Sequence, residues 1–193
     1  MLAPVVEPLP PANQRVVDAA ARKGVQLEIV TFAETTHTAE DAARALGARL
    51  DQIVKSLVFV SPRDDGDLDP FLVLCAGPHR VDVSRLAAVL SEPGIRRATA
   101  REARDLTGFP IGGIPPLGHQ RPIRIVMDPE LGRHETVWAA AGTPNTVFAT
   151  TPATLRSLTN AVVATVVTDP TPAIRPLDGD QSEGLASRSI PGG

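Results

Sequence analysis

The segment from Thr107 to His119 limits the possible folds of this chain more than any other stretch. It holds four glycines and three prolines among thirteen residues. Proline has no backbone N–H to donate, and glycine loses the most backbone entropy on ordering. This composition therefore cannot continue a helix or a central strand. The segment predicts a shaped loop between regular elements.

Two interpretations of this loop remain open from its composition. It can be a plain connection that is fixed to a core by four apolar side chains, those of Phe109, Ile111, Ile114 and Leu117. It can also bind a ligand, because the pair Gly112 and Gly113 exposes backbone N–H groups that are able to meet one.

Lys55 is the second unusual feature, because the chain has seventeen arginines and only two lysines. It lies in 53–60, the strongest predicted strand, on the same face as Leu57 and Phe59. If that face points inward, the ammonium needs an anionic partner or a cleft, since an unpaired buried charge is costly. A lysine at the strand end whose amine reaches solvent fits the spacing equally well.

The remaining pattern alternates short helices and strands. Helices are predicted at 12–23, 39–46, 83–90, 100–106 and 152–158. Their N-terminal capping residues are expected to be Thr38 with Asp41, Asp82, and Thr99 with Glu102. Strands are predicted at 26–32, 53–60, 71–76, 95–98, 122–127, 135–141, 146–150 and 161–168.

This interleaving predicts an α+β fold, a single compact domain with a mixed, curled, barrel-like sheet and flanking helices. The domain is assigned to residues 12–168. Residues 1–11 are rich in proline, and residues 169–193 are rich in proline, glycine, serine and aspartate. Both are therefore expected to be disordered tails.

Composition also narrows the setting and the chemistry. No apolar run reaches the roughly 20 residues that span a bilayer, and the N-terminus lacks a secretory signal, so a cytoplasmic protein is expected. Cys75, the single cysteine, excludes an internal disulfide and predicts a buried, unreactive thiol. The histidines, His37, His79, His119 and His134, have no metal-ligand spacing. Neither a metal nor a cofactor is expected.

Charge is unevenly distributed along the chain, whose formal net charge is −3. The segment 79–124, which contains the glycine-rich loop, holds eight arginines and four acidic residues. A basic segment beside a shaped loop suits a polyanionic partner such as RNA, and it suits a solvated surface as well.

Four segments carry a family resemblance: 53–58, 80–82, 108–119 and 140–148. Taken in this order, they resemble the YbaK/EbsC family of aminoacyl-tRNA deacylases, which are related to the editing domain of prolyl-tRNA synthetase. The resemblance covers roughly residues 12–168. It implies a compact α+β fold that acts in trans to hydrolyse the ester between a wrong amino acid and the 3′ end of tRNA.

The resemblance also implies roles for individual residues. Gly112 and Pro116 match the fixed ends of the family's Gly-x-x-x-Pro loop, whose backbone walls the pocket. Lys55 matches the lysine that holds the terminal adenosine and its phosphate. The implied catalytic set is Lys55, Gly112, Gly113, Ile114, Pro115 and Pro116. The implied substrate-binding set is Gly118, His119, Gly142, Thr143 and Asn145.

The chemistry that the resemblance implies needs no side-chain base. The ribose 2′-OH of the terminal adenosine is thought to position or activate the attacking water. Backbone N–H groups near Gly112, Gly113 and Gly142 are expected to stabilise the developing oxyanion.

One residue departs from the family pattern, because many relatives have serine where this chain has Pro115. The change removes a hydroxyl and stiffens the pocket, so the resemblance does not identify the amino acid of the substrate.

Two candidate functions remain: a trans-editing hydrolase, or a non-catalytic module that binds a nucleotide, a tRNA end or a synthetase. The expected partner is the 3′ end of aminoacyl-tRNA, with a synthetase as a second candidate. Membrane and DNA partners are not expected.

Overall fold

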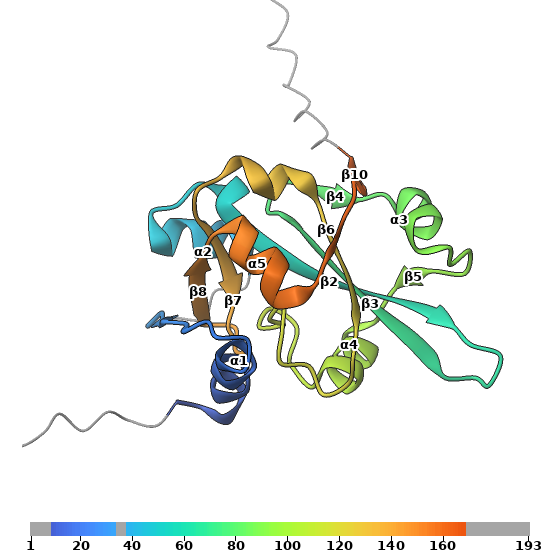
Figure 1. Ribbon diagram of the computed structural model, residues 1–193, viewed down its shortest axis with the longest axis horizontal. Coiled ribbons are helices and arrows are strands. Elements are labelled where there is room, and N and C mark those ends of the chain that lie inside the picture. Colours follow the sequence, from blue (N-terminus) through green and yellow to red (C-terminus); the bar gives the residue numbers. More distant parts are fainter. Residues whose placement is uncertain (1–8, 34–37, 169–193) are drawn as a thin grey trace, which may run out of the picture.

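The computed structural model describes residues 9–33 and 38–168 (Figure 1). The C-terminal segment 169–193, most of the N-terminal one and His37 lie outside the described residues. The first helix begins at Pro11, one residue before the expected start of the domain.

A mixed sheet forms the centre of the domain. Along the sheet its strands follow the order β1-β8-β7-β2-β3-β6-β9, and β5 pairs with β2 beside this path. Their bounds are β1 (Ile29–Thr31), β2 (Ile53–Pro62), β3 (Leu68–Ala76), β5 (Arg96–Arg97), β6 (Arg124–Met127), β7 (Val137–Ala140), β8 (Thr146–Thr150) and β9 (Val162–Val163). A second, two-stranded sheet pairs β4 (Arg80–Val81) with β10 (Val167–Thr168). The predicted α+β fold with a mixed sheet is confirmed, and the strand path is open.

Five α-helices surround the sheet in the described part of the chain: α1 (Pro11–Ala21), α2 (Ala39–Leu46), α3 (Val83–Leu90), α4 (Ala100–Thr107) and α5 (Pro152–Thr159). The two 3-10 turns are η1 (Leu50–Gln52) and η2 (Pro129–Arg133). All three predicted N-caps are confirmed, and both threonine caps form complete capping boxes. Among these helices, none has the length and apolar character needed to cross a membrane.

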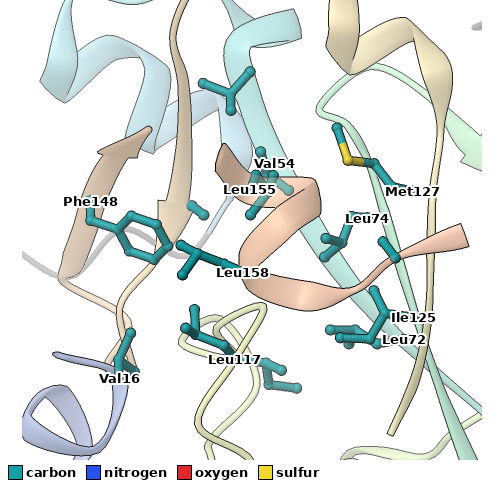
Figure 2. Packing of buried hydrophobic residues seen from close by; sticks show 14 of the residues in the cluster. Val16, Val54, Leu72, Leu74, Leu117, Ile125, Met127, Phe148, Leu155 and Leu158 are labelled. Carbon is teal, nitrogen blue, oxygen red and sulfur yellow. The ribbon is translucent and has the colours of Figure 1, made fainter. Parts of the chain in front are cut away.

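β2 and β3 form a long antiparallel hairpin at the centre of the sheet, with β7 parallel to β2 and β6 parallel to β3. Because both faces of the hairpin are covered, its strands read as continuous apolar runs. Val54, Val58 and Leu74 face a cluster that α1, α5 and the 107–119 loop complete. Figure 2 shows Leu155 and Leu158 of α5 within this cluster.

The opposite face of the hairpin is covered by other helices. Phe59, Phe71 and Val73 pack with Leu86 of α3. Nearer the start of β2, Ile53 packs with Ala42 and Ala43 of α2. The strand alternation of β2 therefore places α2 on one face of the sheet and the glycine-rich loop on the other.

Two strand predictions need correction. The predicted strand 161–168 is two short strands, β9 beside β6 and β10 beside β4. The chain changes sheets because buried Asp128 accepts a hydrogen bond from the N–H of Val166, whose carbonyl accepts one from Asp82. The strand predicted at 26–32 is reduced to β1.

The connection between β6 and β7 also differs from a simple turn. η2 carries the chain across the sheet, so that β6 lies beside β3 and β7 beside β2. Both strands lie parallel to their neighbours, an arrangement that needs a crossover and cannot be made by a tight hairpin.

The start of α4 generates a pH-dependent prediction. Arg96 binds the carboxylate of Glu102 at 2.7 Å, and the Thr99 N–H donates to it at 2.8 Å. These bonds, the one from Arg96 most of all, lower the pKa of Glu102 from 4.5 to about 2. The carboxylate therefore stabilises the fold above pH 4.5, and the stabilisation is lost as the pH falls toward 2.

We expect Glu102→Gln to lower the unfolding midpoint in urea at pH 7, and the difference from wild type to shrink steadily below pH 4.5. Glu135→Gln is the control, because Glu135 is exposed and forms no ion pair within the described residues. A difference that stays constant from pH 7 to pH 3 would contradict this role for Glu102.

Candidate functional site

A pocket of about 320 Å³ lies on the side of β2 that faces away from β3. Its floor is formed by Lys55, Ser56 and Leu57 of β2. The start of α2 lies on one side of it and the glycine-rich loop on the other, while β7 and β5 supply residues at its two ends. The pocket therefore joins segments that are far apart in the sequence.

The bend of the glycine-rich loop is a tight turn from Pro110 to Gly113. The Gly113 N–H donates to the Pro110 carbonyl at 3.0 Å, and Gly112 has a φ of +86°, which favours glycine. Gly113 is required for a different reason. A Cβ at this position would lie 2.6 Å from the carbonyl carbon of Thr143. The bend and the 143–146 turn are thus packed backbone to backbone.

α1 holds the loop against the core through Arg15. Its guanidinium lies 4.0 Å from the centre of the Phe109 ring and donates to the Gly108 carbonyl at 2.6 Å. Phe109, Ile114 and Leu117 are buried as predicted. The prediction for Ile111 is wrong, because its side chain is 53% exposed and lines the pocket.

Lys55 is half-buried and lines the pocket, so its amine lies beside a cleft. Its Nζ is 3.5 Å from the His79 carbonyl oxygen, a long and weak contact. Arg97 of β5 lines the same pocket, with its guanidinium 5.4 Å from the centre of the Phe59 ring. Within the described residues neither cation forms an ion pair. Two cations without an ion-pair partner, against the single carboxylate of Glu40 in the described lining, make this pocket suitable for an anion.

The other lining groups limit the chemistry. Among the described lining residues, Glu40 in the first turn of α2 is the one carboxylate, and there is neither a histidine nor a cysteine. Cys75 is buried beside the hairpin ladder, and burial raises the pKa of its thiol to about 11. It is therefore protonated at neutral pH. In residues 9–33 and 38–168, no group of three or more His, Cys, Asp or Glu side chains is placed to hold a metal ion.

The structure separates the predicted catalytic residues into three groups. Lys55, Gly112 and Ile114 line the pocket together. Gly113 and Pro115 are buried and are not among the residues that line it. Pro116 lines a second hollow, of about 240 Å³, which lies between α1 and α5.

Gly118 and His119, which were expected to bind substrate, also line this second hollow. His119 donates from Nε2 to the Pro115 carbonyl at 2.8 Å, and its ring meets Phe109 edge to face. Burial lowers the pKa of His119, which favours the neutral ring. In this structure His119 supports the loop from behind.

The other predicted substrate-binding residues belong to the 142–145 turn, and they make internal contacts. The Thr143 hydroxyl donates to Asn145 Oδ1 at 2.9 Å, and Asn145 Nδ2 donates to the Phe32 carbonyl at 3.4 Å. Gly142 lies against α1, where a Cβ would be 2.8 Å from the Ala12 carbonyl oxygen. These three residues are not among those that line the pocket.

Of the three expected oxyanion donors, Gly113 already donates its N–H to the Pro110 carbonyl within the turn. Gly112 lines the pocket, and Gly142 packs closely against the Ala12 backbone.

Several lining residues were missed from the sequence. Arg97 lies within the basic segment 79–124. That segment indicated a positively charged region, but it did not indicate which of its arginines would line the pocket. Trp138 of β7 is the only tryptophan in the chain, and it lines the pocket with Pro144 and Thr146. Thr146 is held by the buried side chain of Asn13, whose Nδ2 donates to its hydroxyl at 2.7 Å. Nothing in the local sequence pattern distinguishes these residues from ordinary core and turn positions.

The chain is similar to several known proteins. Residues 33–158 match the family described as the aminoacyl-tRNA editing domain. A solved structure described provisionally as a trans-editing enzyme for prolyl tRNA synthetase is 42% identical, with a TM-score of 0.74. The match covers 82% of this chain and 98% of that one.

Curated relatives include two kinds of protein. The uncharacterized protein YwhH of Bacillus subtilis (strain 168) is 30% identical over 125 residues, which is 65% of this chain and 76% of that protein. A proline--tRNA ligase of Methylobacillus flagellatus is 34% identical over 91 residues. The match covers 47% of this chain but 16% of the ligase, so the similarity concerns a small part of that enzyme.

The close contact at Gly113 predicts the effect of adding one methyl group. We expect Gly113→Ala to lower the free energy of unfolding by about 1–3 kcal/mol, because the new Cβ would push the bend away from Thr143. Gly132→Ala is the matched control, since a Cβ there meets no atom within 4 Å, and its effect should stay within about 0.5 kcal/mol. Urea denaturation measures both, and equal stability of the two variants would contradict the packing described.

Proposed function

The chain belongs to the aminoacyl-tRNA editing domain family, and from that premise we propose that it is a trans-acting deacylase for mischarged tRNA. The substrate is the ester between a wrong amino acid and the 3′-terminal adenosine. The observation that carries this proposal is the shared pocket, in which Lys55 and the bend at Gly112 and Ile114 face one hollow.

Lys55 is proposed to contact the phosphate of the terminal nucleotide. It lies in a rigid central strand, its amine has one weak contact, and Arg97 adds a second positive charge. A phosphate would supply the anion that neither cation finds within the described protein. Hydrogen bonds to charged groups contribute about 1.5–3 kcal/mol each, so one such contact has a measurable effect on binding.

The reaction is proposed to depend on the substrate's own hydroxyl. Water attacks the ester carbon, the bond from that carbon to the ribose 3′-oxygen breaks, and the 3′-oxygen takes up a proton. The products are the free amino acid and uncharged tRNA. The ribose 2′-OH, next to the ester, would orient or activate the water. The absence of histidine and cysteine from the described lining supports this role.

The apolar lining of the pocket is proposed to limit the size of the amino acid. Ile53, Ile111 and Trp138 are among the apolar residues of this lining. Such walls exclude bulk well but separate neighbours that differ by one methylene by only about 1–3 kcal/mol. Several small amino acids are therefore expected as substrates, and a synthetase partner would be one means of narrowing the choice of tRNA.

The decisive experiment measures deacylation by the purified chain of a panel of misacylated tRNAs, in which both the amino acid and the tRNA vary. Turnover of at least one member above the spontaneous rate is expected. If no member is hydrolysed while a tRNA 3′ end binds saturably, the chain is instead a binding module.

Lys55→Ala should reduce kcat/KM for the best substrate about 10- to 100-fold and leave the unfolding midpoint nearly unchanged, because the lost contact is made to the ligand. The control is Lys23→Ala, which removes the only other lysine, located at the second hollow. Equal activity of Lys55→Ala and wild type would remove the role proposed for this amine.

Salt provides an independent test of the phosphate contact. The logarithm of kcat/KM at low substrate concentration should fall linearly with the logarithm of salt concentration, because phosphate contacts release counterions. Lys55→Ala should reduce the slope by about 0.7, the value for one contact to a single-stranded end. An unchanged slope would show that Lys55 does not contact a phosphate.

A further inference from the structure

The side of β2 that faces the pocket is paired in two separate places. β7 pairs with it at Ile53 and Val54, and β5 pairs with it at Phe59 and Val60. On the other side, β3 pairs with β2 without interruption from Val54 to Pro62. Between the two partial partners, the described residues leave a gap in the sheet, and the pocket lies at this gap.

The continuous register with β3 identifies the backbone groups that face the gap. In an antiparallel ladder, successive residues alternate in directing N–H and C=O toward the partner strand and away from it. The Val58 carbonyl points away from β3, because it accepts a hydrogen bond from the Ala98 N–H at 3.0 Å. Ser56, two residues earlier, therefore directs both its N–H and its C=O into the gap.

A second observation concerns the side chain of Ser56, whose hydroxyl lacks a hydrogen-bond partner. The hydroxyl oxygen is buried. Buried polar groups in folded proteins are normally paired, because leaving one unpaired costs free energy. The residue lines the pocket.

We propose that the aminoacyl group of the substrate pairs with the Ser56 backbone as if it were one residue of a missing strand. This inference rests on the proposed function and specifies how the ester is held. An α-aminoacyl ester carries its nitrogen and its carbonyl on either side of one carbon, as a residue in a strand does. Facing residues in an antiparallel ladder can exchange two N–H···O bonds. The α-ammonium then donates to the Ser56 carbonyl, and the ester carbonyl accepts from the Ser56 N–H.

This pairing has two consequences for the reaction. It recognises the part that all α-amino acids share, so that side-chain selection is left to the apolar walls. It also supplies a backbone donor at the ester oxygen on which negative charge develops when water attacks. Ser56 thus supplies an oxyanion donor that Gly113 cannot, because the Gly113 N–H already donates to the Pro110 carbonyl.

The first test measures binding of two stable adenosine analogues to the whole chain by calorimetry. One carries L-alanine and the other propionic acid, each joined to a 3′-amino-3′-deoxyadenosine through an amide, so that they differ only in the ammonium group. We expect the alanyl analogue to bind about 10- to 100-fold more tightly. Equal affinities would overturn the proposal.

Glu40 is the competing explanation for such a preference, because its carboxylate lies on the pocket wall. The pairing predicts that Glu40→Gln keeps most of the difference between the two analogues. If Glu40→Gln abolishes the difference, the ammonium is bound by Glu40, and the proposed pairing is wrong.

The second test removes the Ser56 N–H by replacing the peptide bond before residue 56 with an ester, through incorporation of glyceric acid. Deacylation should fall about 100-fold or more, the usual effect of losing one oxyanion donor. The control replaces the peptide bond before Asp64 with an ester and keeps the Asp64 side chain. Asp64 lies in the exposed turn between β2 and β3. Thermal midpoints identify any variant that is poorly folded. Unchanged turnover in a folded variant without the Ser56 N–H would overturn the proposal.

The two tests separate this inference from the function on which it rests. Deacylation together with equal binding of both analogues would keep the editing function and reject the pairing. A preference for the alanyl analogue that survives Glu40→Gln, in a chain that hydrolyses no aminoacyl-tRNA, would keep the pairing and reject the hydrolase.

Discussion

The unequal pairing of the two sides of β2 is the constraint on which the rest of the structure depends. β3 pairs with β2 along one side without interruption from Val54 to Pro62. On the other side, β7 and β5 pair with β2 only near its two ends. A sheet interior normally leaves no backbone polar group unpaired, so an interruption beside a pocket is a natural place for a ligand. Figure 1 shows how the central hairpin brings these separate segments together.

Charge and packing act together at this gap. Lys55 and Arg97 reach it from two different strands, and the rigid hairpin fixes the position of both. On the opposite face of the sheet, α1 fixes the glycine-rich loop through Arg15, which donates to the Gly108 carbonyl, and the turn before β8 through Asn13, which donates to the Ala141 carbonyl. The contacts around the pocket are therefore mostly structural, and few side chains remain free to meet a ligand. This agrees with chemistry in which the substrate supplies the reactive hydroxyl.

Sequence reasoning pointed to two segments that line the pocket, and it also named residues that do not line it. The glycine-rich loop and Lys55 stand out because of their composition, and both reach the pocket. Gly118, His119, Thr143 and Asn145 lie in the same motifs, yet their side chains and backbone hold neighbouring elements together. A motif contains such supporting residues as well as those that line the pocket. Spacing alone cannot tell the two apart.

The sequence by itself determined the local elements: the capped helices, the long apolar hairpin and the turns that contain glycine and proline. These depend on hydrogen bonds and side-chain periodicity within a few residues, so the α+β class follows from them. Only the tertiary structure decided that β6 and β7 lie on opposite sides of the hairpin, that 161–168 divides between two sheets, and that Ser56 faces a gap. Those outcomes depend on which distant backbone groups pair with one another, and local sequence carries no record of that choice.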